Sequence, residues 1–115
     1  MESITGQSPS GIIAATFNDQ LVREAGELIG EDAMWAGYAG FYGTGLNIHR
    51  TPYSGRVFEY YSEDPLLSGI MAEYVTEGVQ SRRPYILSKI YSFRIISNIR
   101  PALCRIISSE SFPSS

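Results

Sequence analysis

Charged and aromatic side chains are concentrated between residues 46 and 65, where no hydrophobic period is sustained. The charged members are His49, Arg50, Arg56, Glu59, Glu63 and Asp64, and the aromatic ones are Tyr53, Phe58, Tyr60 and Tyr61. Arginine and carboxylate groups can each make paired hydrogen bonds to neighbouring hydroxyls, and aromatic rings stack on the apolar faces of sugars. The residue types of this segment therefore permit a carbohydrate site.

The same residues have a purely structural interpretation. Arg56 and Glu59 can form an internal ion pair that braces a long loop, and Asp64 can simply cap the helix that follows it. On residue type alone this interpretation is the stronger one. His49 is likewise more simply a hydrogen-bonded structural histidine than a base, because no nucleophile stands beside it in the sequence.

Composition narrows the functional classes. The chain has 115 residues, a formal net charge of -3 and a hydrophobic fraction of 43%, which fits one small globular domain. The glycines between residues 40 and 45 indicate tight packing rather than a phosphate cradle, because no helix start with the required spacing follows them. One cysteine, Cys104, and one histidine cannot together build a Cys/His metal site. No stretch approaches the roughly 20 apolar residues of a membrane span.

Charge is distributed unevenly along the chain. After Gln80 the only acidic residue is Glu110, whereas six residues are basic: Arg82, Arg83, Lys89, Arg94, Arg100 and Arg105. A basic tail of this kind raises the possibility of nucleic-acid binding, but no recognisable nucleic-acid-binding module accompanies it. We therefore expect no nucleic-acid partner.

Hydrophobic spacing predicts the elements of the first half. The apolar run Gly11–Thr16 suits a buried strand. Asn18 or Asp19 then caps an amphipathic helix that Gly37 closes. The expected apolar face of that helix consists of Leu21, Val22, Ala25, Leu28, Ile29, Ala33 and Ala36. Tyr38–Tyr42 predicts a second buried strand, with its aromatic residues in the core.

A long loop is expected over Gly43–Tyr61, and Asp64-Pro65 is a strong helix start. The helix that begins there should extend to about Gln80. Strand, helix, strand, long loop and helix in this order predict an α/β protein with parallel strands, in which ligands bind beyond the carboxyl ends of the strands. Pro84–Ile99 could supply one or two further strands, and the end of the chain is expected to be disordered.

Three motifs in this order and spacing resemble glycoside hydrolase family 3, the β-glucosidase group, over about residues 8–80. They are Leu46-Asn47-Ile48-His49-Arg50, the run Gly55-Arg56-Val57-Phe58-Glu59-Tyr60-Tyr61-Ser62-Glu63-Asp64-Pro65, and Leu67-Ser68-Gly69. The resemblance implies part of the family's N-terminal TIM-like (β/α) barrel. It implies a retaining, exo-acting glycosidase that uses two carboxylates and no cofactor.

Carried over by position, Arg56 resembles the family's arginine that hydrogen-bonds hydroxyls of the nonreducing sugar. Glu59 resembles the acid that orients this arginine, and Asn47, His49 and Arg50 resemble the loop shaped around it. The motif Gly43-Thr44-Gly45 departs from the family's more usual central proline. Neither the family's nucleophilic aspartate nor its acid/base glutamate has a counterpart here, so we expect no catalytic residue in this chain and no catalysis by it alone.

The resemblance ends near Gln80. We therefore divide the chain into residues 1–80, a partial N-terminal barrel domain, and residues 81–115, a tail. This tail is either divergent and disordered or read out of frame, and the encoding DNA distinguishes these alternatives. The expected partner is a small carbohydrate such as a β-glucoside, and uncovered barrel faces favour self-association. The alternative function is a small non-catalytic module that binds carbohydrate or protein.

Overall fold

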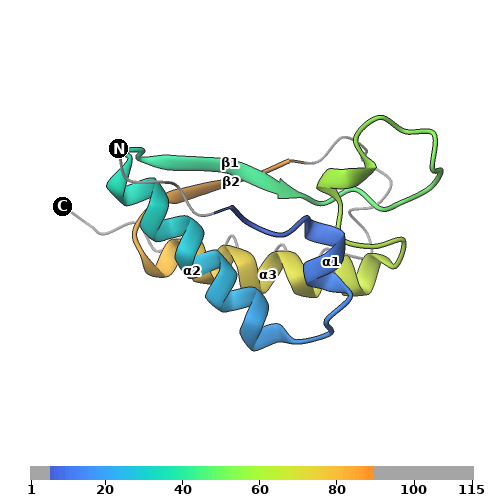
Figure 1. Cartoon of the computed structure of the whole chain (residues 1–115), viewed down its shortest axis with the longest axis horizontal. Helices are drawn as coiled ribbons and strands as arrows, with labels where there is room; N and C mark the ends of the chain where they lie inside the picture. The colour runs from blue at the N-terminus through green and yellow to red at the C-terminus, as the bar shows by residue number, and fades with distance from the viewer. Residues whose placement is uncertain (1–5, 90–115) are drawn as a thin grey trace.

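The computed structural model describes residues 6–89, which form helices packed on one face of a two-stranded sheet (Figure 1). The elements are α1 (Ser10–Ala14), α2 (Asp19–Trp35), β1 (Gly40–Gly45), the 3-10 helix η1 (Val57–Glu59), α3 (Pro65–Ser81) and β2 (Tyr85–Lys89). The two strands are parallel, with Gly40 opposite Tyr85, and α3 lies between them in the sequence. This mixed helix and strand organisation confirms the predicted α/β class.

Both long helices begin at the predicted caps. The Asn18 side chain accepts a hydrogen bond from the Leu21 N–H at 3.1 Å. The Asp64 carboxylate accepts from the N–H groups of Leu66 at 3.0 Å and Leu67 at 3.3 Å. Each cap satisfies amide hydrogens that have no partner within the helix, which typically contributes about 1 kcal/mol.

The strand predicted over Gly11–Thr16 is wrong, because this stretch contains helix α1. The amides of Ile12 and Ile13 both donate to the Pro9 carbonyl, which starts a helical turn. Ala14 is 1% exposed whereas Ile12 is 61% exposed, so only one face of the run meets the core. A short apolar run fits a buried strand and a short helix equally well, and here the tertiary contacts select the helix.

The strand predicted over Tyr38–Tyr42 exists, but it begins at Gly40 and extends to Gly45. Tyr38 and Tyr42 are 65% and 67% exposed, so their assignment to the core is wrong. Phe41, between them, packs against the core. The helices cover one face of the sheet, and alternate side chains of a strand point to opposite faces.

Helix α2 packs on α3 through two glycines and through only part of the predicted apolar stripe, namely Val22 and the half-buried Ile29. Val22, Gly26 and Gly30 are the buried residues of α2. Leu21 and Leu28, which were expected to face the core, are 45% and 47% exposed. A Cβ atom added to Gly26 would lie 2.5 Å from the Val75 carbonyl oxygen, which shows how closely the two backbones approach.

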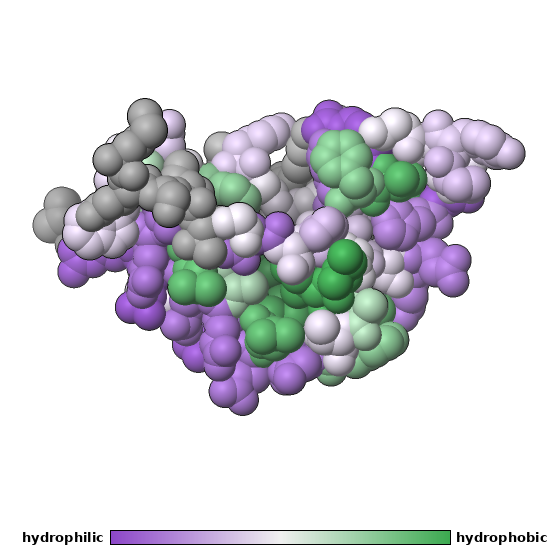
Figure 2. All heavy atoms as spheres, in the orientation of Figure 1, coloured by the Kyte–Doolittle hydropathy of each residue, from purple (hydrophilic) through white to green (hydrophobic). Residues whose placement is uncertain are grey.

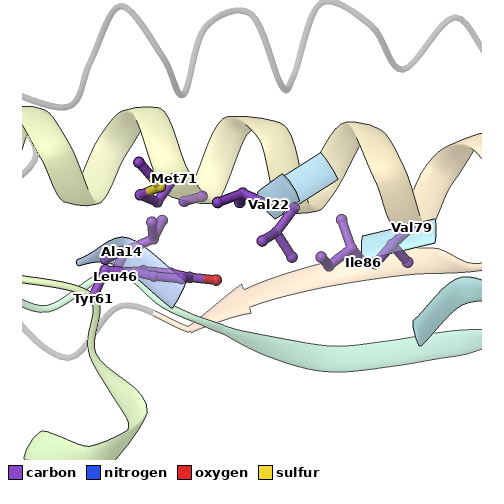
Figure 3. Packing of buried hydrophobic residues seen from close by; sticks show 9 residues of the cluster. Ala14, Val22, Leu46, Tyr61, Met71, Val79 and Ile86 are labelled. Carbon is purple, nitrogen blue, oxygen red and sulfur yellow. The ribbon is translucent and has the colours of Figure 1, made fainter. Parts of the chain in front are cut away.

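The hydrophobic core lies between α3 and the sheet, and α1 and α2 close its sides (Figure 3). Its fully buried members come from every layer of the described fold. They are Ala14, Val22, Leu46, Tyr61, Met71, Ala72, Val75, Val79 and Ile86. Leu46 and Tyr61 mark the start and the end of the long loop, so both ends of that loop are anchored in the core.

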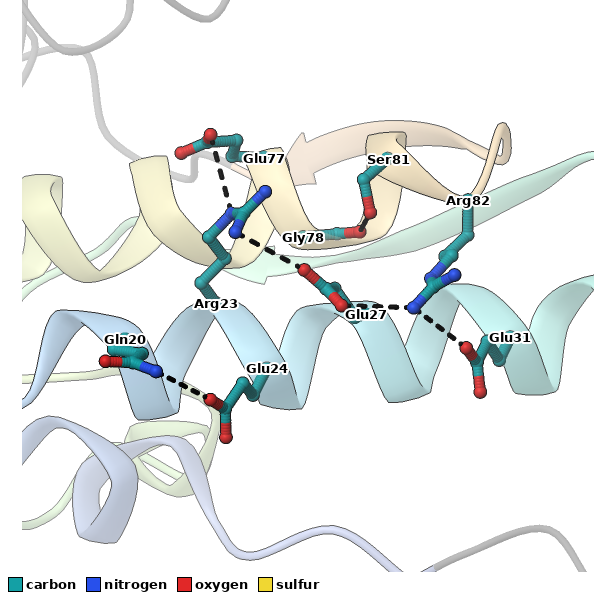
Figure 4. A network of polar contacts seen from close by, with 9 residues as sticks. All are labelled: Gln20, Arg23, Glu24, Glu27, Glu31, Glu77, Gly78, Ser81 and Arg82. Atoms are coloured by element: carbon teal, nitrogen blue, oxygen red, sulfur yellow. Dashed lines mark hydrogen bonds and ion pairs between the residues drawn. The ribbon is translucent and has the colours of Figure 1, made fainter.

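Ion pairs connect α2 with the C-terminal end of α3 (Figure 4). The Arg82 guanidinium lies 3.1 Å from the Glu27 carboxylate and 3.0 Å from that of Glu31. Arg23 approaches Glu27 at 3.6 Å and Glu77 at 3.5 Å. These groups are partly exposed, so each pair contributes at most about 1 kcal/mol.

Residues just after Gln80 take part in the described structure. Arg82 belongs to the ion-pair network, and β2 is the strand expected within Pro84–Ile99. The remainder of that expected strand region and of the predicted tail, residues 90–115, lies outside the described residues.

Candidate functional site

The long loop leaves the carboxyl end of β1 and returns to the same end of the strand. Gly45 forms an isolated parallel bridge with Tyr60. The predicted loop over Gly43–Tyr61 is therefore shorter and more ordered than expected, because β1 extends to Gly45 and η1 occupies Val57–Glu59. The loop is held at the strand's carboxyl end, which is where α/β folds bind ligands.

His49 connects the two halves of this loop. Its backbone N–H donates to the Ser62 carbonyl at 3.0 Å, and its Nε2 atom lies 2.8 Å from the Val57 carbonyl oxygen. A carbonyl oxygen can only accept, so Nε2 carries the proton and donates it. The imidazole thus has the structural role that the sequence favoured, with Nε2 engaged in the loop.

Arg56 and Glu59 form a two-point ion pair on the outer side of the loop. The Arg56 Nε and one terminal nitrogen each donate to a different carboxylate oxygen of Glu59, both at 2.8 Å. The 3-10 helix η1 places residues three apart on the same side, which brings the two groups together. Their side chains are 45% and 25% exposed, so the pair adds little stability but fixes the plane and direction of the guanidinium.

The other two predicted site residues lie elsewhere in the loop. Asn47 is buried at 9% exposure, whereas Arg50 is exposed. A cavity of about 420 Å³ is lined by His49, Arg50 and Glu63 together with loop residues 51, 52, 57 and 58. Arg56 and Glu59 are not among the residues that line it. The structure thus places the predicted residues in one loop, with the Arg56–Glu59 pair separate from the cavity.

Two residues beneath the loop were missed by the sequence reasoning as parts of the site. Thr44 has a φ of 59° at the point where the pairing register shifts between Gly43 and Gly45. Its side chain is buried against Tyr61, whose ring anchors the end of the loop. A residue other than glycine with positive φ is strained, and such strain often occurs near functional sites. The unusual Gly43-Thr44-Gly45 motif was the only signal for it.

Burial raises the pKa of the Tyr61 hydroxyl to about 12, and the neighbouring Thr44 hydroxyl opposes this rise only weakly. The Thr44 Oγ1 atom makes no hydrogen bond of ordinary geometry, so desolvation is the dominant cause. A phenol with a raised pKa keeps its proton more firmly in the folded state than in the unfolded state. Tyr61 therefore does not destabilise the fold through ionisation until the pH exceeds about 10.

We expect the free energy of unfolding to fall between pH 10 and pH 12 by about 2–3 kcal/mol because of Tyr61. Urea unfolding of the wild-type chain and of Tyr61→Phe at pH 8, 10, 11 and 12 measures this contribution as the difference between the two pH profiles. Tyr53→Phe is the matched control, since Tyr53 is 95% exposed. Identical pH profiles for the wild type and Tyr61→Phe would contradict the assignment.

Residues 6–89 contain neither a metal site nor a membrane-spanning helix. In that range no group of three or more His, Cys, Asp or Glu side chains is arranged to hold a metal ion. None of its helices is long and apolar enough to cross a membrane.

Part of this chain is similar in sequence to known glycosidases. No family model matches the chain. It is 40% identical over 74 residues to an exo-α-(1→6)-L-arabinopyranosidase from Bifidobacterium longum. It is 42% identical over 72 residues to β-glucosidase A of Butyrivibrio fibrisolvens and 46% identical over 74 residues to a β-glucosidase of Ruminococcus albus. These matches cover 63–64% of this chain but only 8–10% of the relatives.

The fold has a solved counterpart as well. The crystal structure of a β-glucosidase from Paenibacillus barengoltzii superposes with a TM-score of 0.76 and 27% sequence identity. The match covers 90% of this chain and 13% of that enzyme. Sequence and structure therefore agree that this chain is a relative of one segment of the β-glucosidases.

Proposed function

We propose that this chain is the part of a retaining, exo-acting glycosidase of the β-glucosidase type that holds the nonreducing sugar. The segment fits a partial (β/α) barrel, with residues 1–80 as part of its N-terminal domain. Parallel strands β1 and β2 and the intervening helix α3 support this assignment. In such barrels the loops after the strands carry the active site.

The observation that supports the proposal most strongly is the Arg56–Glu59 pair on the loop after β1. A guanidinium held by two hydrogen bonds is pre-oriented, so little rotamer entropy is lost when it binds a pair of sugar hydroxyls. Glu59 acts through Arg56 and not on the sugar. Asn47, His49 and Arg50 shape the loop, with His49 fixing its width through the Val57 and Ser62 carbonyls.

In this proposal the chain supplies binding and not the chemical steps. Retaining glycosidases need a nucleophilic carboxylate and an acid/base carboxylate on opposite sides of the glycosidic bond. Both would come from parts of a longer enzyme. We therefore expect the 115-residue chain by itself to give no turnover of 4-nitrophenyl β-D-glucopyranoside above buffer. Measurable hydrolysis by the purified chain that persists in Arg56→Ala would contradict this division of roles.

A segment exchange tests the proposal directly. Residues 8–89 replace the matching segment of the Paenibacillus barengoltzii β-glucosidase, and kcat/KM of the chimera is measured with the same chromogenic glucoside. We expect the chimera to remain a β-glucosidase. A folded but inactive chimera would contradict the proposal. Saturable glucose binding by the 115-residue chain alone, abolished by Arg56→Ala, would favour a non-catalytic binding module instead.

A further inference from the structure

Several apolar side chains of α2 are exposed. Leu21, Leu28 and Trp35 recur at intervals of seven and are 45%, 47% and 79% exposed. Beside them the half-buried Ala25 and Ile29, of which Ile29 also packs against the core, line an open, largely apolar cavity of about 420 Å³ between α1, α2 and β1. We call these five residues the open face of α2. Figure 2 shows apolar side chains gathered in the hollow over α1 and α2.

This apolar area is larger than the scattered apolar residues that are normal on a surface. Residues spaced by three, four and seven positions on a helix form one continuous stripe. Continuous apolar stripes of this kind normally contact another polypeptide segment. Because the buried side of α2 is already occupied by the glycine contact with α3, the open face is a second packing surface.

The charges along α2 indicate which sign of charge a segment bound to the open face should carry. The helix carries five acidic residues and one basic residue, and Glu24 and Glu31 follow the edge of the open face at the same spacing of seven. Asp32, which stands four residues after Leu28 and three after Ile29, interrupts the stripe and lines the cavity. Pairing of two copies through this face would bring acidic residues together, so a segment that is apolar and basic fits it better.

The chain itself contains a segment of this chemistry. Residues 90–109 contain three arginines, Arg94, Arg100 and Arg105, and no acidic residue. The segment also supplies apolar side chains in abundance, which include Ile90, Ile95, Ile96, Ile99, Leu103, Ile106 and Ile107. The chain reaches it directly after β2 ends at Lys89. About 12 extended residues span the 39 Å longest dimension of the molecule, so the segment is long enough to reach α2.

We propose that residues 90–107 dock on the open face of α2 of the same molecule. Isoleucine side chains would fill the apolar cavity, and arginines would lie beside Glu24 and Asp32. This contact does not depend on the glycosidase proposal, since it concerns only how the chain covers its own apolar surface. It would give the basic tail a structural role whether or not the loop binds a sugar.

The single cysteine makes the test direct, because Cys104 lies in the proposed docking segment. A nitroxide label on Cys104 broadens amide signals of residues that approach it, and the reduced label provides the diamagnetic reference. We expect the amides of Leu28 and Ile29 to lose most of their intensity while those around Arg56 retain theirs. Higher salt should weaken the effect, because charge attraction contributes to the contact.

Two leucine variants form a matched pair. Leu28→Ser removes an apolar group from the open face, and Leu66→Ser removes an exposed leucine from the start of α3. We expect Leu28→Ser to reduce the broadening along α2 and Leu66→Ser to leave it unchanged. Uniform broadening over the molecule, or none on α2, would overturn the proposal. Broadening that appears when spin-labelled chains are mixed with unlabelled isotope-enriched chains would assign the face to a second copy and would also overturn it.

Discussion

Replacing Gly78 by alanine is expected to destabilise the fold by about 3 kcal/mol, although alanine is by itself the better helix former by about 1 kcal/mol. A Cβ atom at Gly78 would overlap the carbonyl oxygen of Arg23 and lie 2.8 Å from the Glu27 nitrogen and 2.9 Å from the Gly26 Cα. All three are backbone atoms of α2, which cannot turn away as a side chain could. The two helices would have to separate, and the core beneath them would lose contacts.

Urea unfolding followed by circular dichroism at 222 nm measures this loss. Gly55→Ala is the control, because a Cβ atom at Gly55 would meet nothing within 4 Å. We expect that variant to change the free energy of unfolding by less than about 0.5 kcal/mol. If Gly78→Ala costs less than about 1 kcal/mol, α2 and α3 are farther apart in solution than the structure places them.

The glycine contact explains which parts of the fold the sequence could predict. The helix starts at Asn18 and Asp64 were predictable, because a cap depends on a side chain and on amides three residues away. The face that α2 buries was only partly predictable from apolar spacing, which included Val22 but missed the glycines. Gly26 and Gly30 carry no side chain, so they add nothing to an apolar stripe, yet they allow the backbones of α2 and α3 to approach closely.

The predictions of the short elements were wrong for a different reason. The apolar residues of Gly11–Thr16 satisfy a strand pattern and a single helical turn, and only the contacts of Ala14 with the core decide between them. Tyr42 is apolar enough for a core, but it lies on the opposite face of β1 from Phe41, and its exposure depends on whether a second layer covers that face. A local sequence pattern contains no information about contacts between residues that are distant in the sequence.

In the candidate site, too, local features were predictable from the sequence and long-range packing was not. The sequence located the loop and paired Arg56 with Glu59, because their spacing of three and their opposite charges are local properties. The roles of Thr44 and Tyr61 beneath the loop depend on long-range packing and on a positive φ that no residue preference indicates for threonine. The Arg56–Glu59 pair also satisfies both interpretations left open at the start. It braces η1, and it fixes the direction of the guanidinium that we propose binds the sugar.

The experiment with the largest expected functional effect separates these two roles. In the active chimera, Arg56→Ala should lower kcat/KM for 4-nitrophenyl β-D-glucopyranoside by about 1000-fold, or about 4 kcal/mol, because two charge-assisted hydrogen bonds to the sugar are lost. Arg56→Lys keeps the charge but loses the two-point hydrogen bonding of the guanidinium, so we expect kcat/KM to fall about 100-fold. Glu59→Gln keeps the shape of the side chain but holds Arg56 less firmly in place, so we expect kcat/KM to fall about 10-fold.

The order of these three losses distinguishes binding from bracing. If Arg56 only braces the loop, truncating either partner of the ion pair removes the same contact, so Arg56→Ala and Glu59→Ala should reduce kcat/KM equally. If Arg56 binds the sugar, its loss must exceed that of Glu59, whose effect is transmitted through the guanidinium. Arg83→Ala controls for the loss of an exposed arginine outside the loop and should leave kcat/KM within about twofold. Equal losses for Arg56→Ala and Glu59→Ala would refute the substrate-binding role of Arg56.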